Sequence, residues 1–329
     1  MKRALLFLFI CLTITCNAQA AALPENKAVF QLGSNKYLLN DKEQIMDTIP
    51  FLSNGRALMP VRYLAQACGI EDSNISWDPV TQKVTLNLDG KYLQLRVGSK
   101  QLLENGQTAD MDTAPLIISD RVFLPARWIA EAYNYRVDWN QTSKTVIIYA
   151  QGSIKPAAPG QSAVLLVNKS HPLPTAYAPG ALEDFNGYRI SKSMKDPLQQ
   201  LFIAAGKQSI NLTVNSGYRD AEKQQQIFDE RVSELGLQAA KATVAQPGFS
   251  EHQTGLAVDI GVDSYDFSWL KVNSWRYGFI QRYPEGSEKI TNYAYEPWHF
   301  RYVGSPVASF MHINNVQTLE EFVDTYIGE

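Results

Sequence analysis

Two short segments in the second half of the chain carry the residues best suited to bind a metal ion. Only four histidines occur in 329 residues. His252 comes shortly before Asp259, and His299 comes shortly after Glu296. Two imidazole nitrogens and one carboxylate oxygen would supply the three protein ligands of a catalytic zinc ion, leaving a fourth position for water. The remaining glutamate has the chemistry of a general base for that water.

The elements around these residues decide whether they can meet. Residues 256–260 alternate so that a strand would bury Leu256, Val258 and Ile260 and present Asp259 on its other face. A carboxylate within an otherwise apolar strand is unfavourable unless it is paired or metal-bound. The glycine-containing turn before this strand can fold His252 back over the carboxylate. Pro297 argues against a helix in the second segment, so a helical His-Glu-x-x-His site is excluded.

A third segment, residues 216–220, offers a cation to the same site. Gly217 allows a sharp turn, and Arg219 stands at the head of a helix predicted over residues 221–235. An arginine there could stabilise the oxyanion that forms when water attacks a peptide carbonyl.

The residues alone leave structural interpretations open for each segment. His252 and Asp259 could be a hydrogen-bonded structural pair, the Glu296 segment could be an aromatic strand end, and Arg219 could form a surface ion pair. His171 and His312 have no acidic neighbours at ligand spacing, so we expect both on the surface or in loops.

Taken together, the three segments resemble the VanY-type D-alanyl-D-alanine carboxypeptidase family over residues 164–304. The matching motifs are Ser-Gly-Tyr-Arg at 216–219, Ser-x-His-x-x-Gly-x-Ala-x-Asp at 250–259 and Glu-x-Trp-His at 296–299. The resemblance implies one zinc ion per chain. It assigns zinc binding to His252, Asp259 and His299, catalysis to Glu296 and Arg219, and substrate contact to Gln224, Ser250 and Ser216.

The same resemblance implies a zinc-dependent hydrolase that removes the terminal D-residue from peptidoglycan stem peptides. The alternatives are an L,D-carboxypeptidase or D,D-dipeptidase on the same scaffold, or a non-catalytic wall-binding protein. The intact set of ligands and base favours an enzyme. Asp220 departs from the family, in which serine is common, and we expect it to be able to pair with Arg219.

The first half of the chain contains an internal repeat. Arg56, Pro60, Arg62 and Trp77 recur as Arg121, Pro125, Arg127 and Trp139. These units resemble the copper amine oxidase N-terminal-like domain over residues 27–150. The stretch contains no histidine, so we expect no metal site there. We expect its arginines and tryptophans to pack and form ion pairs, with contact to the cell wall as the alternative.

Composition and the first residues predict an exported protein. The formal net charge of −3 gives no broad basic field, which argues against nucleic-acid binding. Lys2 and Arg3, an apolar run over 4–14 and a small-residue site at 18–20 predict a signal peptide over residues 1–20. We therefore expect an extracellular or cell-envelope location, membrane-anchored if the signal stays uncleaved; a lipid anchor at Cys16 is a further alternative.

Cleavage of the signal would remove Cys11 and Cys16 and leave Cys68 as the single cysteine of the mature chain. We expect Cys68 to be a core residue without a disulfide.

The predicted organisation is thus a signal peptide (1–20), a β-rich two-repeat domain (27–150), a linker (151–163) and a peptidase domain (164–329). Gly, Ser, Pro and Ala predominate in the linker. In the peptidase domain, predicted helices alternate with strands, which indicates the α+β class. We expect a small antiparallel sheet flanked by helices.

Overall fold

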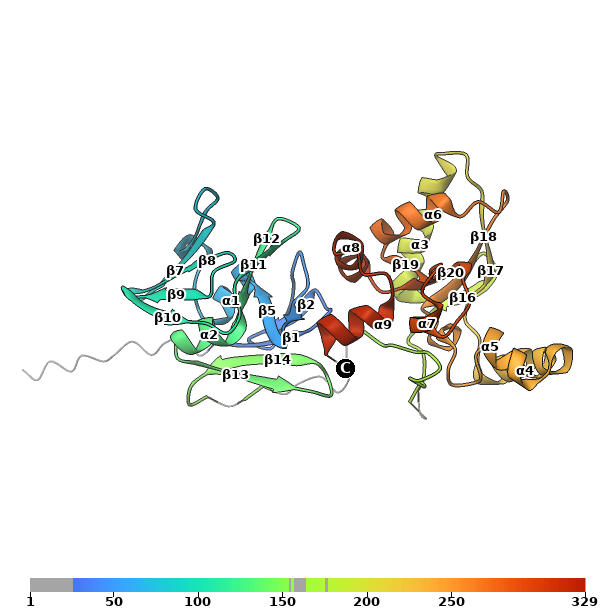
Figure 1. Ribbon diagram of the computed structural model, residues 1–329, viewed down its shortest axis with the longest axis horizontal. Helices are drawn as coiled ribbons and strands as arrows, with labels where there is room; N and C mark the ends of the chain where they lie inside the picture. The colour runs from blue at the N-terminus through green and yellow to red at the C-terminus, as the bar shows by residue number, and fades with distance from the viewer. Residues whose placement is uncertain (1–25, 154, 157–163, 175–176, 329) are drawn as a thin grey trace, which may run out of the picture.

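A computed structural model describes residues 26–153, 155–156, 164–174 and 177–328. A β-rich lobe at the N-terminal side and a mixed lobe at the C-terminal side lie next to each other (Figure 1). The predicted signal peptide lies outside the described residues, as does most of the predicted linker. None of the described helices is both long and apolar enough to cross a membrane.

Three antiparallel sheets and two short helices build the N-terminal lobe, in the strand orders β13-β14-β1-β2-β3, β10-β9-β8-β7-β6 and β11-β12-β5-β4. Its elements are β1 (Lys27–Gln31), β2 (Lys36–Leu39), β3 (Lys42–Ile45), β4 (Phe51–Ser53), β5 (Arg56–Pro60), α1 (Val61–Ala67), η1 (Asp72–Asn74), β6 (Ile75–Asp78), β7 (Lys83–Leu88), β8 (Lys91–Arg96), β9 (Gln101–Glu104), β10 (Gln107–Asp110), β11 (Leu116–Ile118), β12 (Arg121–Pro125), α2 (Ala126–Ala132), β13 (Tyr135–Asn140) and β14 (Thr145–Ala150).

The two repeats interleave instead of folding side by side. The last two strands of the second repeat, β13 and β14, join β1, β2 and β3 of the first, and β6 and β7 of the first join β8, β9 and β10 of the second. Pro60 and Pro125 each end a strand and start a helix, and these two strands also pair across the repeats. Each sheet therefore needs both repeats, which makes the pair one folding unit. Cys68 is a buried free thiol in its core.

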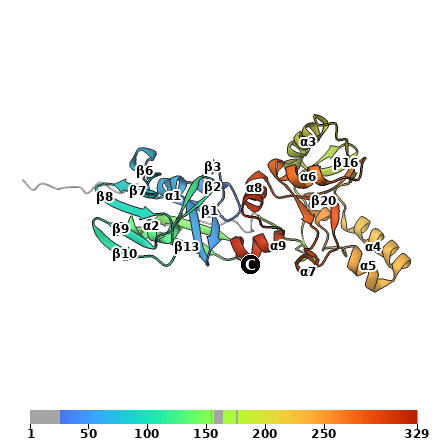
Figure 2. The same cartoon turned by 45° about the horizontal axis from the view of Figure 1, so that its top comes forward.

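The C-terminal lobe has the predicted α+β class, with a small antiparallel sheet in the order β17-β18-β20-β19 and helices around it (Figure 2). Its elements are β15 (Leu182–Phe185), β16 (Tyr188–Ser191), α3 (Lys192–Gly206), β17 (Leu212–Ser216), α4 (Ala221–Leu235), α5 (Leu237–Thr243), η2 (Glu251–Thr254), β18 (Ala257–Val262), α6 (Ser268–Asn273), η3 (Ser274–Tyr277), β19 (Phe279–Tyr283), α7 (Glu288–Thr291), β20 (Glu296–Tyr302), α8 (Ser305–Ile313), α9 (Leu319–Phe322) and η4 (Val323–Ile327).

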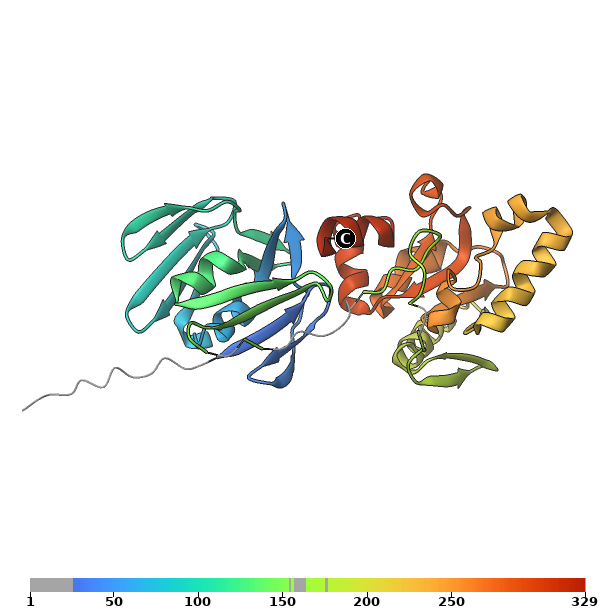
Figure 3. The same ribbon diagram turned by 90° about the horizontal axis from the view of Figure 1, so that it is seen from below.

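The C-terminal helices connect the two lobes. Figures 1 and 3 show α8 and α9 between the β-rich lobe and the sheet of the C-terminal lobe. Phe310 packs on Phe51 of β4 with ring centroids 5.1 Å apart, and Tyr326 also contacts the Phe51 ring. The Lys144 ammonium donates a hydrogen bond to the Gly328 carbonyl. One hydrophobic core therefore runs from the repeats into the end of the chain.

Candidate metal centre and active site

Adjacent strands place Asp259 and His299 side by side. β18 and β20 are antiparallel neighbours, and these two residues are direct cross-strand partners. Side chains of such partners project to the same face of a sheet. The Nδ1 atom of His299 lies 3.2 Å from Oδ1 of Asp259. Two residues that are distant in sequence are thus brought together by strand register.

A short helical turn brings the second imidazole to the same carboxylate. Gly255 ends η2 with a φ of +71°, a left-handed conformation that glycine adopts without strain. The Nε2 atom of His252 lies 3.4 Å from Oδ2 of Asp259. Its Nδ1 atom lies 2.7 Å from the carbonyl oxygen of Gly217 and donates to it, which leaves Nε2 as the acceptor that a metal requires.

Glycine is required at position 217 because this segment packs closely against the backbone of β16. Its backbone conformation itself is one that other residues can adopt. A Cβ atom at this position would lie 2.6 Å from the carbonyl oxygen of Arg189. Only a residue without a side chain lets the segment lie this close to β16, with its own carbonyl toward His252.

The three side chains fit a zinc ion. One ligand atom from each of His252, Asp259 and His299 lies within 4.8 Å of the other two. Oδ1 of Asp259 is buried and has no hydrogen-bond partner among the described residues, which a bound cation would remedy. Burial lowers the pKa of His299, but the carboxylates of Asp259 and Glu251 outweigh this and raise it to about 9. The pocket thus favours positive charge at the place where a metal would lie.

An irregularity in β20 turns Glu296 toward the same point. Residues three apart in a regular strand project to opposite faces. The pairing of β19 with β20 shifts register between Gln281 and Tyr283, and Oε2 of Glu296 lies 3.7 Å from Nδ1 of His299. Burial, together with the charge of Asp259, raises the pKa of Glu296 although the nearby His299 lowers it. A carboxylate with a raised pKa is suited to accept and return a proton near neutrality.

Arg219 lies beside this carboxylate cluster, but the expected pair with Asp220 does not form. The Arg219 guanidinium donates to Oγ of Ser216 at 3.0 and 2.8 Å and to Oδ2 of Asp259 at 3.1 Å. Asp220 instead caps α4 by accepting a hydrogen bond from the backbone N–H of Lys223. An aspartate directly before a helix is favoured in this capping role, because its carboxylate satisfies a free backbone N–H of the first turn.

A cavity of about 250 Å³ contains the cluster. Gln224 and Ser250 line it, whereas Ser216 is not among its lining residues and contacts Arg219. The Gln224 amide donates to the Ala245 carbonyl, and its Oε1 atom is buried without a hydrogen-bond partner in the described part of the chain. Trp298 of the Glu-x-Trp-His motif also lines it, as do Tyr283, Tyr293 and Glu251, to which the sequence analysis assigned no role.

Of the missed residues, Glu251 had a signal in the sequence. It is a charged residue directly before the candidate zinc ligand His252, at a position that the motif leaves undefined. Its burial depends on two arginines from distant strands, and no local pattern predicts such partners.

Comparison with known proteins matches both halves of the chain. The VanY profile, described as D-alanyl-D-alanine carboxypeptidase, matches residues 187–305, and the copper amine oxidase N-terminal domain profile matches residues 16–72 and 38–148. A bifunctional D-Ala-D-Ala dipeptidase and carboxypeptidase of Enterococcus gallinarum is 35% identical over 178 residues, covering 48% of this chain and 92% of the relative. The chain belongs to the VanY family. Members of this family are carboxypeptidases, so the chain is a peptide hydrolase.

Other VanY relatives match the same half of the chain. A D-alanyl-D-alanine carboxypeptidase of Enterococcus faecalis is 42% identical over 177 residues, which cover 49% of this chain and 66% of the relative. Among solved structures, the vancomycin-resistance D,D-pentapeptidase VanY in complex with Zn(II) is 42% identical, with a TM-score of 0.46, covering 49% of this chain and 98% of that one. The LD-carboxypeptidase LdcB is also 42% identical, with a TM-score of 0.45 and coverages of 49% and 85%.

Proposed function

We propose that this VanY-family chain is an exported, zinc-dependent D-alanyl-D-alanine carboxypeptidase that removes the terminal D-residue from peptidoglycan stem peptides. The convergence of His252, Asp259 and His299 beside Glu296, inside a cavity large enough for a short peptide end, carries this proposal. The names of the curated relatives support the substrate class.

The proposed chemistry divides between the metal and the chain. A bound zinc ion would supply a Lewis acid and lower the pKa of a coordinated water. Glu296 would take the proton of the attacking water and return it to the departing amine. Arg219 would hold the carbonyl oxygen of the scissile bond and balance its developing negative charge. Gln224 would offer its unpartnered Oε1 atom to a substrate N–H.

Glu296→Gln tests this proposal, because the amide keeps the size of the side chain but cannot accept the proton. We expect zinc to remain bound and turnover to fall by about 10²- to 10⁴-fold. Zinc content and the products from defined pentapeptide and tetrapeptide stems, read by mass spectrometry, give the two measurements. Full turnover in the variant would refute the role of Glu296.

The products of the wild type distinguish the alternatives. Loss of one alanine from the pentapeptide supports the proposal, and loss from the tetrapeptide supports an L,D-carboxypeptidase. Release of a D-Ala-D-Ala dipeptide supports a dipeptidase. Binding of the peptide without cleavage by the zinc-loaded wild type would indicate a binding protein.

We also propose that the repeat domain contacts the cell wall through the cleft beside Trp77. This cleft, of about 580 Å³, is lined by the Trp77 ring together with Arg62, Asp72 and Asp120. The Trp77 side chain is 40% exposed. An exposed indole face packs well against the apolar face of a sugar ring, and the flanking charges can bind its hydroxyl groups.

The equivalent cleft of the second repeat supplies a matched control. Trp139 lines it with Arg127, but Gly328 from the end of the chain also lines it, and its volume is about 290 Å³. We expect Trp77→Ala to reduce the fraction of protein that sediments with purified insoluble peptidoglycan, and Trp139→Ala to leave it near the wild-type level. Equal sedimentation of wild type and Trp77→Ala would refute the wall contact.

A further inference from the structure

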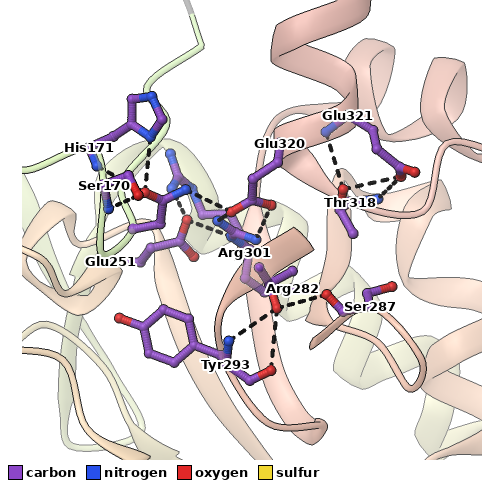
Figure 4. Close-up of polar contacts among 12 residues, drawn as sticks. Ser170, His171, Glu251, Arg282, Ser287, Tyr293, Arg301, Thr318, Glu320 and Glu321 are labelled. Carbon is purple, nitrogen blue, oxygen red and sulfur yellow. Dashed lines mark hydrogen bonds and ion pairs between the residues drawn. The ribbon is translucent and has the colours of Figure 1, made fainter. Parts of the chain in front are cut away.

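Two glutamates and two arginines form a buried cluster beside the metal site. Glu251 and Arg282 have fully buried side chains, Arg301 is 2% exposed and Glu320 is 8% exposed. Figure 4 shows these four side chains converging from the turn before β18, from β19 and β20, and from α9. Two negative and two positive charges balance within the cluster. Such a cluster is stable only if its members are fully paired.

Glu251 divides its two oxygen atoms between different tasks. Oε1 accepts hydrogen bonds from Nε of Arg282 at 2.8 Å and from Nη1 of Arg301 at 2.7 Å. Oε2 lies 3.5 Å from Nε2 of His299. Among the described residues, neither Oε2 nor this ring nitrogen has a hydrogen-bond partner, and both are buried. Each therefore has unused capacity for a hydrogen bond and faces the other.

We propose that Glu251 is a positioning residue for the zinc ligand His299. In this role the 3.5 Å contact would close to a hydrogen bond from the Nε2 proton of His299 to Oε2 of Glu251, which would place the lone pair of the ring on Nδ1, the atom beside Asp259. Carboxylates that hold the far nitrogen of a metal-binding histidine in this way fix its tautomer and its ring orientation. Glu251 does not touch the reacting atoms in this role.

The two arginines hold the Glu251 carboxylate in place. Arg282 reaches Glu251 from β19, and Arg301 reaches it from β20, the strand that also carries His299. Arg301 also donates to the carbonyl oxygen of Leu165 at 2.8 Å. With both arginines anchored in the sheet, Oε1 cannot move without breaking two charge-assisted hydrogen bonds, and Oε2 stays directed at the histidine.

Glu320 extends this arrangement to the C-terminal helix. Its two oxygens accept from Nη1 and Nη2 of Arg282 at 2.8 and 2.7 Å, and Oε1 also accepts from the Asn168 amide at 2.9 Å. Thr318 and Glu321 form a capping box that starts α9 and fixes the position of Glu320. This helix lies beyond the residues matched by the VanY profile and packs into the core shared with the repeat domain. The C-terminal segment therefore supports the metal site through Arg282.

Zinc affinity tests this inference, which rests on the zinc site of the proposed function. Glu251→Asp keeps the negative charge between the two arginines but shortens the side chain, so the fold should persist while the contact to His299 is lost. We expect the zinc dissociation constant, measured by chelator competition, to rise about 10- to 100-fold. The visible spectrum of the Co²⁺-substituted protein should also change, because the orientation of one ligand changes.

Two variants of α9 locate the effect. Glu320→Gln removes the negative charge that faces Arg282. We expect its zinc dissociation constant to lie between those of the wild type and Glu251→Asp. Glu321→Gln is the matched control, because it makes the same chemical change on the next residue while glutamine still completes a capping box. We expect its zinc affinity and Co²⁺ spectrum to equal those of the wild type.

The outcomes separate this inference from the proposed function. If the wild type binds no zinc, the proposed function fails. If the wild type binds zinc and folded Glu251→Asp, checked by circular dichroism, binds it equally well with an unchanged Co²⁺ spectrum, only the positioning role of Glu251 is refuted. Wild-type affinity in Glu320→Gln would refute the contribution of the C-terminal helix.

Discussion

Charged pairs connect distant segments in both lobes, but they are exposed in the repeat domain and buried in the peptidase domain. Across the repeats, Arg121 pairs with Asp47 at 2.7 Å, and Arg56 pairs with Asp112 in the equivalent position. These four side chains are 41–56% exposed. In the peptidase domain, the side chains of Glu251, Arg282, Arg301 and Glu320 are at most 8% exposed.

The difference shows that exposure, not the number of charges, decides what an ion pair does. Water already solvates the partners of an exposed pair, so forming the pair changes the free energy of unfolding little. A buried charge that loses its partner stays desolvated, so breaking the pair is strongly destabilising. The repeats are accordingly stabilised by their shared apolar core, whereas the metal site depends on a polar network.

The largest expected effect comes from Arg282→Met. The change leaves the carboxylate of Glu320 without its bidentate partner and removes one of the two cations on Glu251. We expect the free energy of unfolding to fall by about 3–5 kcal/mol. Urea denaturation of the zinc-free protein measures it. A loss below about 1 kcal/mol would show that water reaches the network and would remove the contrast with the repeats.

A similar or somewhat smaller loss is expected from Phe51→Ala at the junction of the lobes. Phe51 packs on Phe123 within the repeats and on Phe310 and Tyr326 of the C-terminal segment. Truncation should cost about 3–4 kcal/mol through lost contacts and the cavity left behind. Calorimetry should show a broader transition, because the lobes no longer share an intact core. One sharp transition at the wild-type temperature would contradict this interpretation.

The smallest effect is expected from Asp47→Asn, which breaks one exposed pair. We expect a loss below about 1 kcal/mol at pH 7 and low salt, and less at high salt. Hydrogen bonds from Arg121 and Tyr63 outweigh partial burial and lower the pKa of Asp47. Its contribution is therefore present above the unfolded pKa and disappears as the pH falls through the folded one. The difference between wild type and variant should vanish in acid; a difference that persists there would have another cause.

How far the sequence predicts each lobe depends on the range of the interactions involved. The helix over 221–235 and the strand containing Asp259 follow from local residue patterns, and the structure has both. The repeat was also visible in the sequence. Its interleaving was not, because identical strand patterns can pair within a repeat or between repeats.

The candidate site divides in the same way. The sequence motifs identified His252, Asp259 and His299 as candidate zinc ligands and Glu296 as the candidate general base. The pair that Asp220 could have formed with Arg219 is absent, because Asp220 directly precedes α4 and caps it by accepting from the Lys223 N–H, a position at which aspartate is favoured.

By itself, the sequence determined the kinds of side chain available, the two domain families and the local elements that carry the ligands. Only the tertiary structure decided that Asp259 and His299 are cross-strand partners, that a shifted register turns Glu296 toward them, and that Glu251 lies between two arginines behind the histidine. The physical reason is that strand register and charge burial depend on contacts between distant segments. Local residue patterns contain no information about which distant segment will pack against a given strand or pair with a given charge.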